Sequence, residues 1–154
     1  MEWKSEQCRM RQMVDAFGVR WTRELLHRIM NVQTAGFAGM CSVLRAGDEI
    51  VAVHAGMRSQ RILHWWFPAY NRKFEKYSPG IILLFRIADA VTATGISTID
   101  LGKDVDRYKR CVMTGSAQLR AGCIEMPSLL WRARPLRRVD ASCAARGGLG
   151  VALR

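Results

Sequence analysis

Three short segments carry residues that together could bind a phosphate and transfer a chemical group. Residues 77–80 read Tyr-Ser-Pro-Gly and precede a long apolar stretch. Ser78 could cap a helix, Pro79 sets φ at its first position, and Gly80 leaves the free backbone N–H groups uncovered. Such a helix start attracts a phosphate through these donors and the positive end of the helix dipole. Taken alone, however, a Ser-Pro-Gly sequence more often marks a simple helix start.

Two later segments supply ionisable groups. Asp100 and Gly102 stand at the end of a β-like stretch, and Tyr108 and Lys109 follow a few residues later. Each segment is ordinary alone, because Asp-Leu-Gly usually ends a strand and Tyr-Lys-Arg usually lies on an exposed surface. A β-α-β connection brings strand ends and the helix N-terminus to one edge of a sheet. We therefore expect the three segments to lie close together in space.

The elements that must position these segments follow from the apolar patterns. Residues 40–57 predict a β-hairpin around a glycine-containing turn, and residues 61–67 predict a further strand ended by Pro68. An apolar helix over residues 78–94 and a strand over residues 97–101 complete a β-α-β unit with parallel strands. The sequence thus predicts an α/β fold, with a mixed sheet whose antiparallel hairpin precedes the β-α-β unit.

The remaining residues flank this core. Residues 1–39 are predicted to be a lead-in segment with a helix at about 20–33, where apolar residues recur at three- and four-residue steps. Residues 40–130 form the predicted core. Residues 131–154 are arginine-rich and then rich in small residues and glycine, so we expect a basic, disordered tail. A last extended segment is expected over residues 118–126.

The predicted strand 61–67 offers side chains for a binding site. Alternation places His64 and Trp66 on one face and Trp65 and Phe67 on the other, so both faces should be covered. Large aromatic residues on a central strand more often pack in a core than line a site. Tyr70, expected in the loop after Pro68, is the better candidate for contacting a ligand.

Composition excludes several classes of protein. The chain has 154 residues, of which 49% are hydrophobic, enough for one domain with a sizeable core. No apolar run approaches the roughly 18–20 residues of a membrane span. The N-terminus is polar and unlike a signal peptide, so we expect a cytoplasmic protein.

Metal and disulfide chemistry find no support in the sequence. The five cysteines are odd in number and widely spaced, without a C-x-x-C pair, and the histidines show no metal-ligand spacing.

The net charge of +11 is concentrated in residues 103–154, which hold 11 basic against 4 acidic residues. This charge suits a nucleotide cofactor, a nucleic acid or an acidic membrane surface. No nucleic-acid-binding motif accompanies it, so nucleic acid is the least favoured partner.

At these motifs the chain resembles the acetyltransferase domain of the cellulose-biosynthesis CelD-type proteins. That domain is a branch of the GNAT acyltransferase superfamily and is related to the Fem-type transferases. The resemblance covers roughly residues 1–126 and rests on an ordered set of motifs, each weak alone. The matching segments are residues 3–7, 65–70, 77–84, 100–103 and 108–110.

The resemblance implies a GNAT-like fold and transfer of an acyl group to an amine or hydroxyl, with exopolysaccharide or cellulose biosynthesis as the expected setting. The co-substrate would be acetyl-CoA or another acyl-CoA, lying where two parallel strands splay. It further implies the following roles. Lys109 stabilises developing negative charge, Tyr108 acts as general acid and Asp100 as base or orienter. The donor would contact Ser78, Pro79, Gly80 and Gly102, and the acceptor would contact Tyr70, Trp66 and His64, although His64 is more often a core residue.

Two departures from the family pattern accompany the resemblance. The usual GNAT phosphate loop, Arg/Gln-x-x-Gly-x-Gly/Ala, is absent, so acyl-CoA binding is inferred from position alone. The chain also resembles a C-terminal portion of a longer member, and a partner chain could supply the missing elements. A non-catalytic GNAT-like module is therefore the main alternative, ahead of a basic nucleic-acid-binding protein.

Overall fold

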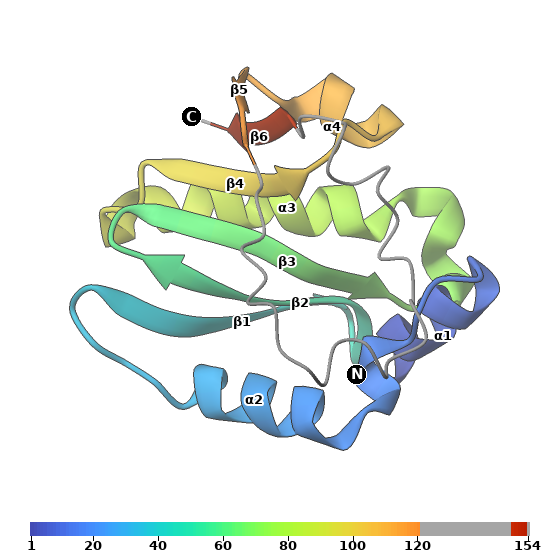
Figure 1. Ribbon diagram of the computed structural model, residues 1–154. Coiled ribbons are helices and arrows are strands. Elements are labelled where there is room, and N and C mark those ends of the chain that lie inside the picture. The colour runs from blue at the N-terminus through green and yellow to red at the C-terminus, as the bar shows by residue number, and fades with distance from the viewer. Residues whose placement is uncertain (121–148, 154) are drawn as a thin grey trace.

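A six-stranded sheet of order β1-β2-β3-β4-β6-β5 organises the described residues, with helices on both faces (Figure 1). The computed structural model describes residues 1–120 and 149–153. The helices are α1 (Glu2–Met10), α2 (Arg20–Met30), α3 (Pro79–Val91) and α4 (Arg107–Val112), with 3-10 turns at Ala16–Gly18, Arg72–Tyr77 and Thr92–Thr94. The strands are β1 (Phe37–Ala46), β2 (Glu49–Ser59), β3 (Ile62–Tyr70), β4 (Thr98–Lys103), β5 (Gly115–Gln118) and β6 (Leu149–Leu153).

The predicted hairpin is confirmed and is longer than expected. Strands β1 and β2 pair antiparallel from Phe37↔Ser59 to Ala46↔Glu49. Gly47 supplies the positive φ of 59° that the tight turn requires. Gly39 is needed for another reason, since a Cβ there would lie 2.2 Å from the carbonyl oxygen of Ile29 in α2. The end of α2 can therefore rest directly on β1.

The β-α-β unit is also confirmed, and its two parallel strands splay. Strands β3 and β4 pair over only three residues, from Ile62↔Thr98 to His64↔Asp100. Beyond this point β3 continues to Tyr70 along β2, while β4 turns toward β6. The expected mixed sheet is therefore present, with a gap opening between β3 and β4.

Strand β3 differs from its prediction in two ways. Its register with β2 shifts between Ala55↔Phe67 and Met57↔His64, so one extra residue bulges at Trp65 and Trp66. The bulge breaks the alternation, and the prediction that Phe67 shares a face with Trp65 is wrong.

Pro68 does not end β3 as predicted. It pairs with His54, and Tyr70 is the last strand residue rather than a loop residue. Because β4 has already left β3 at this point, the proline sits along an unpaired edge, where a missing N–H costs least.

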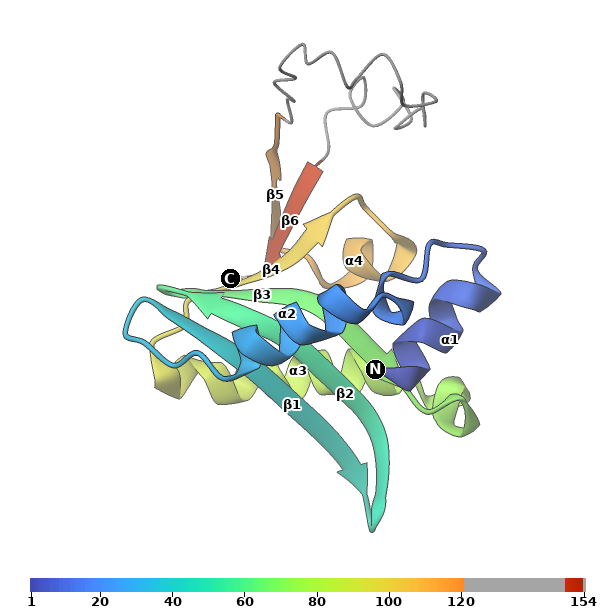
Figure 2. The same ribbon diagram turned by 60° about the horizontal axis from the view of Figure 1, so that its bottom comes forward.

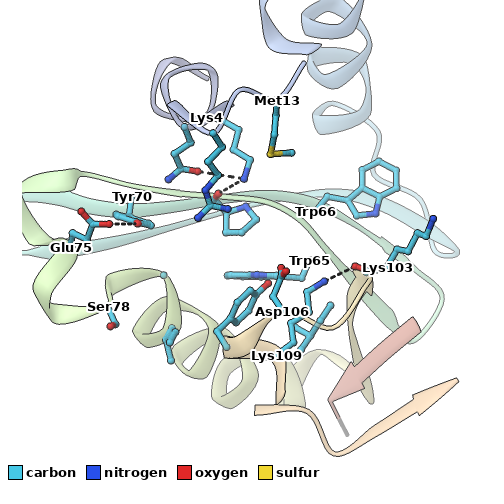
Figure 3. Close-up of a pocket in the computed structure, with 18 residues that line it drawn as sticks. Lys4, Met13, Trp65, Trp66, Tyr70, Glu75, Ser78, Lys103, Asp106 and Lys109 are labelled. Atoms are coloured by element: carbon cyan, nitrogen blue, oxygen red, sulfur yellow. Dashed lines mark hydrogen bonds between the residues drawn. The ribbon is translucent and has the colours of Figure 1, made fainter. Parts of the chain in front are cut away.

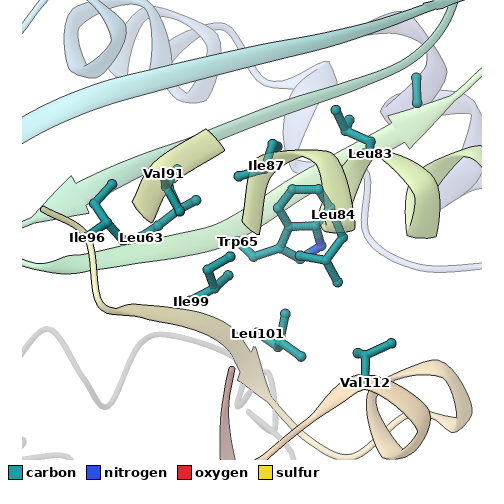
Figure 4. Packing of buried hydrophobic residues seen from close by; sticks show 11 residues of the cluster. Leu63, Trp65, Leu83, Leu84, Ile87, Val91, Ile96, Ile99, Leu101 and Val112 are labelled. Atoms are coloured by element: carbon teal, nitrogen blue, oxygen red, sulfur yellow. The ribbon is translucent and has the colours of Figure 1, made fainter. Parts of the chain in front are cut away.

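The main core fills the space between α3 and the sheet (Figure 4). Helix α3 contributes Leu83, Leu84, Ile87 and Val91, which pack on Leu63, Trp65, Ile99 and Leu101 of β3 and β4. The helix needs this many apolar positions because it crosses several strands. Gly95, with φ of 77°, closes the turn that follows it.

The opposite face of the sheet is covered by α1 and α2 (Figure 2). Cys8, Phe17 and Leu26 form a second buried cluster, and the ring of Phe67 meets that of Phe17 edge-on with centroids 5.0 Å apart. Residues 1–19 show no clear apolar period, yet they contain α1. The lead-in segment is thus packed onto the sheet.

The predicted tail, residues 131–154, lies mostly outside the described residues, and so do residues 121–126 of the predicted extended segment. Within the described part, Leu149–Leu153 form β6, which pairs antiparallel with both β4 and β5. The prediction of disorder is wrong for these five residues. Four of these five residues are apolar and the fifth is Gly150, a composition that is compatible with a short strand.

Candidate active site

A cavity of about 610 Å³ opens where β3 and β4 separate (Figure 3). Its walls come from α1, β3, the start of α3, the end of β4 and α4. Trp65, which packs in the main core, and Trp66, which is exposed, both line the cavity. The separation of β3 from β4 therefore makes the site.

The predicted anion-binding segment forms one wall of the cavity. Ser78, Gly80 and Ile81 line it, whereas Pro79 is buried and does not. Ser78 adopts a left-handed φ of 52°, and its side chain makes no capping hydrogen bond. The prediction that the Ser78 side chain caps this helix is therefore wrong. Its carbonyl oxygen accepts from the backbone N–H groups of Ile81 and Ile82. The first turn of α3 thus faces the cavity without a side-chain cap.

Gly80 keeps that wall open. A Cβ built at this position would meet only Cδ1 of Tyr70, at an ordinary 3.8 Å. A larger side chain would therefore fit the fold while occupying space at the cavity wall.

Lys109 lies on the other side of the cavity and is 6% exposed. Its Nζ donates hydrogen bonds to the carbonyl oxygens of Lys103, at 2.7 Å, and Asp104, at 3.0 Å. These bonds tie α4 to the loop after β4. Because an ammonium group has three N–H donors, one is left unused by the residues that the structure describes and could bind a ligand.

Tyr108 lines the same wall beside Asp106. Burial, and then the negative charge of Asp106, raise the pKa of its phenol. The hydroxyl group therefore stays protonated at neutral pH and can donate a hydrogen bond or a proton.

Gly102 is the third predicted residue at this wall. It has φ of 80° and lines the cavity. Its backbone N–H donates to Oδ1 of Asp100 at 2.8 Å. Asp100 itself does not line the cavity. Its carboxylate holds the β4 backbone in place from the other face of the strand.

Of the three residues expected to contact the acceptor, Tyr70 and Trp66 line the cavity and His64 does not. The hydroxyl group of Tyr70 donates to Oε1 of Glu75 at 3.1 Å. Burial, the hydrogen bond to Glu75 and its charge raise the pKa of Tyr70. His64 instead points toward Ser59 and Asp100.

Helix α1 supplies residues that sequence reasoning missed. Lys4 and Gln7 of α1, and Arg11 just after it, line the cavity, and Nζ of Lys4 donates to the carbonyl oxygen of Pro68 at 3.1 Å. Burial lowers the pKa of Lys4. The resemblance of residues 3–7 to the family lead-in was the available signal.

The cavity has an excess of positive charge. Lys4, Arg11, Lys103 and Lys109 line it, against the carboxylates of Glu75 and Asp106. Across residues 1–120 and 149–153 no group of three potential metal-ligating side chains comes together. No helix within the described part of the chain is long and apolar enough to cross a membrane. The excess of positive charge around the cavity suits an anionic ligand.

Comparison with known proteins gives the family of this chain. Two solved structures have similar shapes: an acetyltransferase from Bacillus cereus (14% identity, covering 89% of this chain and 94% of that chain, TM-score 0.47) and the ribosomal-protein-S18-alanine N-acetyltransferase from Escherichia coli (12% identity, 86% and 75%, TM-score 0.48). The search of curated proteins found no match. The family model described as "Acetyltransferase (GNAT) domain" matches residues 1–110, and this chain therefore belongs to the GNAT acetyltransferase domain family.

Proposed function

We propose that this protein transfers an acyl group from acetyl-CoA or another acyl-CoA to an amine or hydroxyl group. The observation that carries the proposal is the cavity at the β3–β4 splay. It has the open first turn of α3 on one side and Lys109 with Tyr108 on the other. Membership of the GNAT family supports an acyl thioester as the donor.

The donor's phosphates would bind at the start of α3. Backbone N–H groups and the helix dipole attract anions there, and Gly80 leaves room for close approach. The positive side chains around the cavity add attraction without a dedicated phosphate loop. The acyl end would then extend between β3 and β4 toward Trp65 and α4.

Lys109 and Tyr108 have positions suited to the chemical step. The acceptor attacks the thioester carbonyl carbon, and the free N–H of Lys109 stabilises the resulting oxyanion. When the C–S bond breaks, Tyr108 gives its proton to the departing sulfur, since its raised pKa keeps it protonated. The acceptor's proton passes to solvent. Asp100 acts as an orienter through Gly102 rather than as a base in the cavity.

The acceptor would enter past Trp66 and Tyr70, on the side of Lys4 and Arg11. Aromatic faces stack well on sugar rings, which agrees with an acceptor in exopolysaccharide or cellulose biosynthesis. This narrower assignment rests on the motif resemblance of residues 65–70 and 77–84.

Ligand-induced thermal stabilisation tests the donor site. At 100 times its dissociation constant, a ligand of the native state adds about 2.7 kcal/mol to the unfolding free energy. We expect acetyl-CoA to raise the melting temperature of the parent and of Gly36→Val, which changes an open loop position. Gly80→Val should melt at the parent temperature and lose the acetyl-CoA shift. An equal shift in Gly80→Val would remove α3 as the phosphate site.

Turnover then separates an enzyme from a non-catalytic module. Release of free CoA in the presence of an amine or sugar acceptor measures transfer. Binding of acetyl-CoA without transfer to any tested acceptor would favour the non-catalytic module.

A further inference from the structure

A second group of reactive side chains lies on the sheet outside the cavity. Nε2 of His64 lies 2.6 Å from Oγ of Ser59, and Nδ1 of His64 lies 3.1 Å from Oδ2 of Asp100. The three side chains come from β2, β3 and β4, at the point where β3 and β4 are last paired. We call this the Ser59–His64–Asp100 row.

The row fixes one tautomer of His64. An ionised carboxylate only accepts hydrogen bonds, so Asp100 requires the proton on Nδ1. Nε2 is then an acceptor, and the Ser59 hydroxyl group donates to it. Asp100 is itself held by the backbone N–H of Gly102 at 2.8 Å. A hydroxyl nucleophile, a base and a positioned orienter thus stand in the order that activates a serine.

The row is accessible to small molecules. Ser59 is half-buried, and the side chains of His64 and Asp100 are 22% and 37% exposed. On the same strand, Ile62 is 38% and Trp66 44% exposed, and the ring centroids of His64 and Trp66 are 6.4 Å apart. Two exposed apolar side chains therefore flank the base and offer contact to the organic part of an ester.

We propose that Ser59 is a nucleophile that accepts acyl groups from activated esters, with His64 as base and Asp100 as positioning residue. Oγ of Ser59 attacks the ester carbonyl carbon while His64 Nε2 takes its proton. The C–O bond to the leaving alcohol breaks, and the alcohol takes that proton from His64. Water then attacks the acyl-serine by the same path and releases the carboxylic acid. This site does not depend on the proposed acyl-CoA function.

The test is site-specific acetylation of the full chain by p-nitrophenyl acetate, read by mass spectrometry of peptides. We expect acetyl groups on Ser59 in the parent protein and in Ser116→Ala, which changes an exposed serine of β5. Ser59→Ala should lose this label. His64→Gln should lower its rate of formation by about 100-fold or more, the usual contribution of a general base.

The positioning role of Asp100 has a separate readout. Asp100→Asn should slow Ser59 acetylation and change its pH dependence, because an amide favours the other tautomer of His64. Asp100→Glu should recover part of the rate by restoring a carboxylate. Labelling that spares Ser59 in the parent protein, or that proceeds at an equal rate in His64→Gln, would overturn the proposal and leave the row as a hydrogen-bonded link between strands. The parent peptide map decides this even where a variant fails to fold.

Discussion

The buried histidine of β2 gives the sharpest prediction about stability. His54 is 0% exposed, and neither ring nitrogen makes a hydrogen bond to any of the described residues. Its ring stacks on that of Trp65, with centroids 4.2 Å apart and planes 12° from parallel. Burial lowers the pKa of His54 from 6.5 to about 4. The folded protein therefore holds this imidazole neutral.

The size of the effect follows from linkage. A histidine in the unfolded chain binds its proton near pH 6.5, whereas His54 in the folded chain does so only near pH 4. Between these values the unfolded state carries more protons, so stability falls as pH falls. At about 1.36 kcal/mol for each pKa unit, roughly 3 kcal/mol of unfolding free energy is lost on going from pH 7 to pH 4.

Urea unfolding at pH 7, 5.5 and 4.5 measures this loss. Carboxylates also titrate in the range, so the comparison is between the parent and His54→Leu, which cannot titrate at this position. We expect His54→Leu to lose less stability on acidification. At pH 7 it should be as stable as the parent or more so, because unpaired buried polar groups cost about 1–3 kcal/mol. His27→Gln, at an exposed position of α2, is the control and should follow the parent.

Equal acid sensitivity of the parent and His54→Leu would refute this reasoning. It would mean that His54 gains a proton in the folded state as readily as in the unfolded chain. Water inside the core beside Trp65 would then be the physical explanation to test.

Three further predictions concern the site and the packing. Lys109→Met should reduce the rate of acyl transfer by about 10²–10³-fold, as expected for loss of an oxyanion donor. It should also lower the melting temperature, because the carbonyl groups of Lys103 and Asp104 lose their hydrogen-bond donor. Enzyme assays measure the first effect and thermal melts the second. Tyr108→Phe should reduce turnover with little change in the affinity for acetyl-CoA, and an unchanged rate would remove its role as acid. Gly39→Val should strongly destabilise the protein, unlike Gly36→Val, because its Cβ would lie 2.2 Å from a backbone oxygen of α2, and urea unfolding measures the difference.

Much of the sheet could be predicted from the sequence because its apolar residues alternate or recur with a clear period. The hairpin, β3, α3 and β4 all have this local signal. The closeness in space of the motifs near the cavity could be predicted as well. A β-α-β unit places its helix start and strand ends at one edge whatever the details of packing.

What the sequence did not show depends on contacts between distant residues. Helix α1 has only one buried residue, Cys8, so its sequence has no apolar stripe that would predict a helix. The bulge at Trp65 and Trp66 arises from the register of β3 against β2, which no local pattern encodes. Because of the bulge, Phe67 packs against Phe17 and not beside Trp65, so the predicted face of Phe67 was wrong. His64 and Asp100 were expected at the cavity, and instead they meet Ser59.

The placement of β6 has a consequence for how the protein is made. This strand lies between β4 and β5, although it follows both in the chain. During synthesis β4 is complete long before Leu149–Leu153 leave the ribosome. The edge of β4 that pairs with β6 therefore stays unpaired while the rest of the sheet assembles. Within the described residues, β5 pairs with β6 alone, so β5 also has no partner strand until β6 is made. An unpaired edge invites association with other chains, so nascent or shortened forms of this protein should be the ones that chaperones bind and proteases remove.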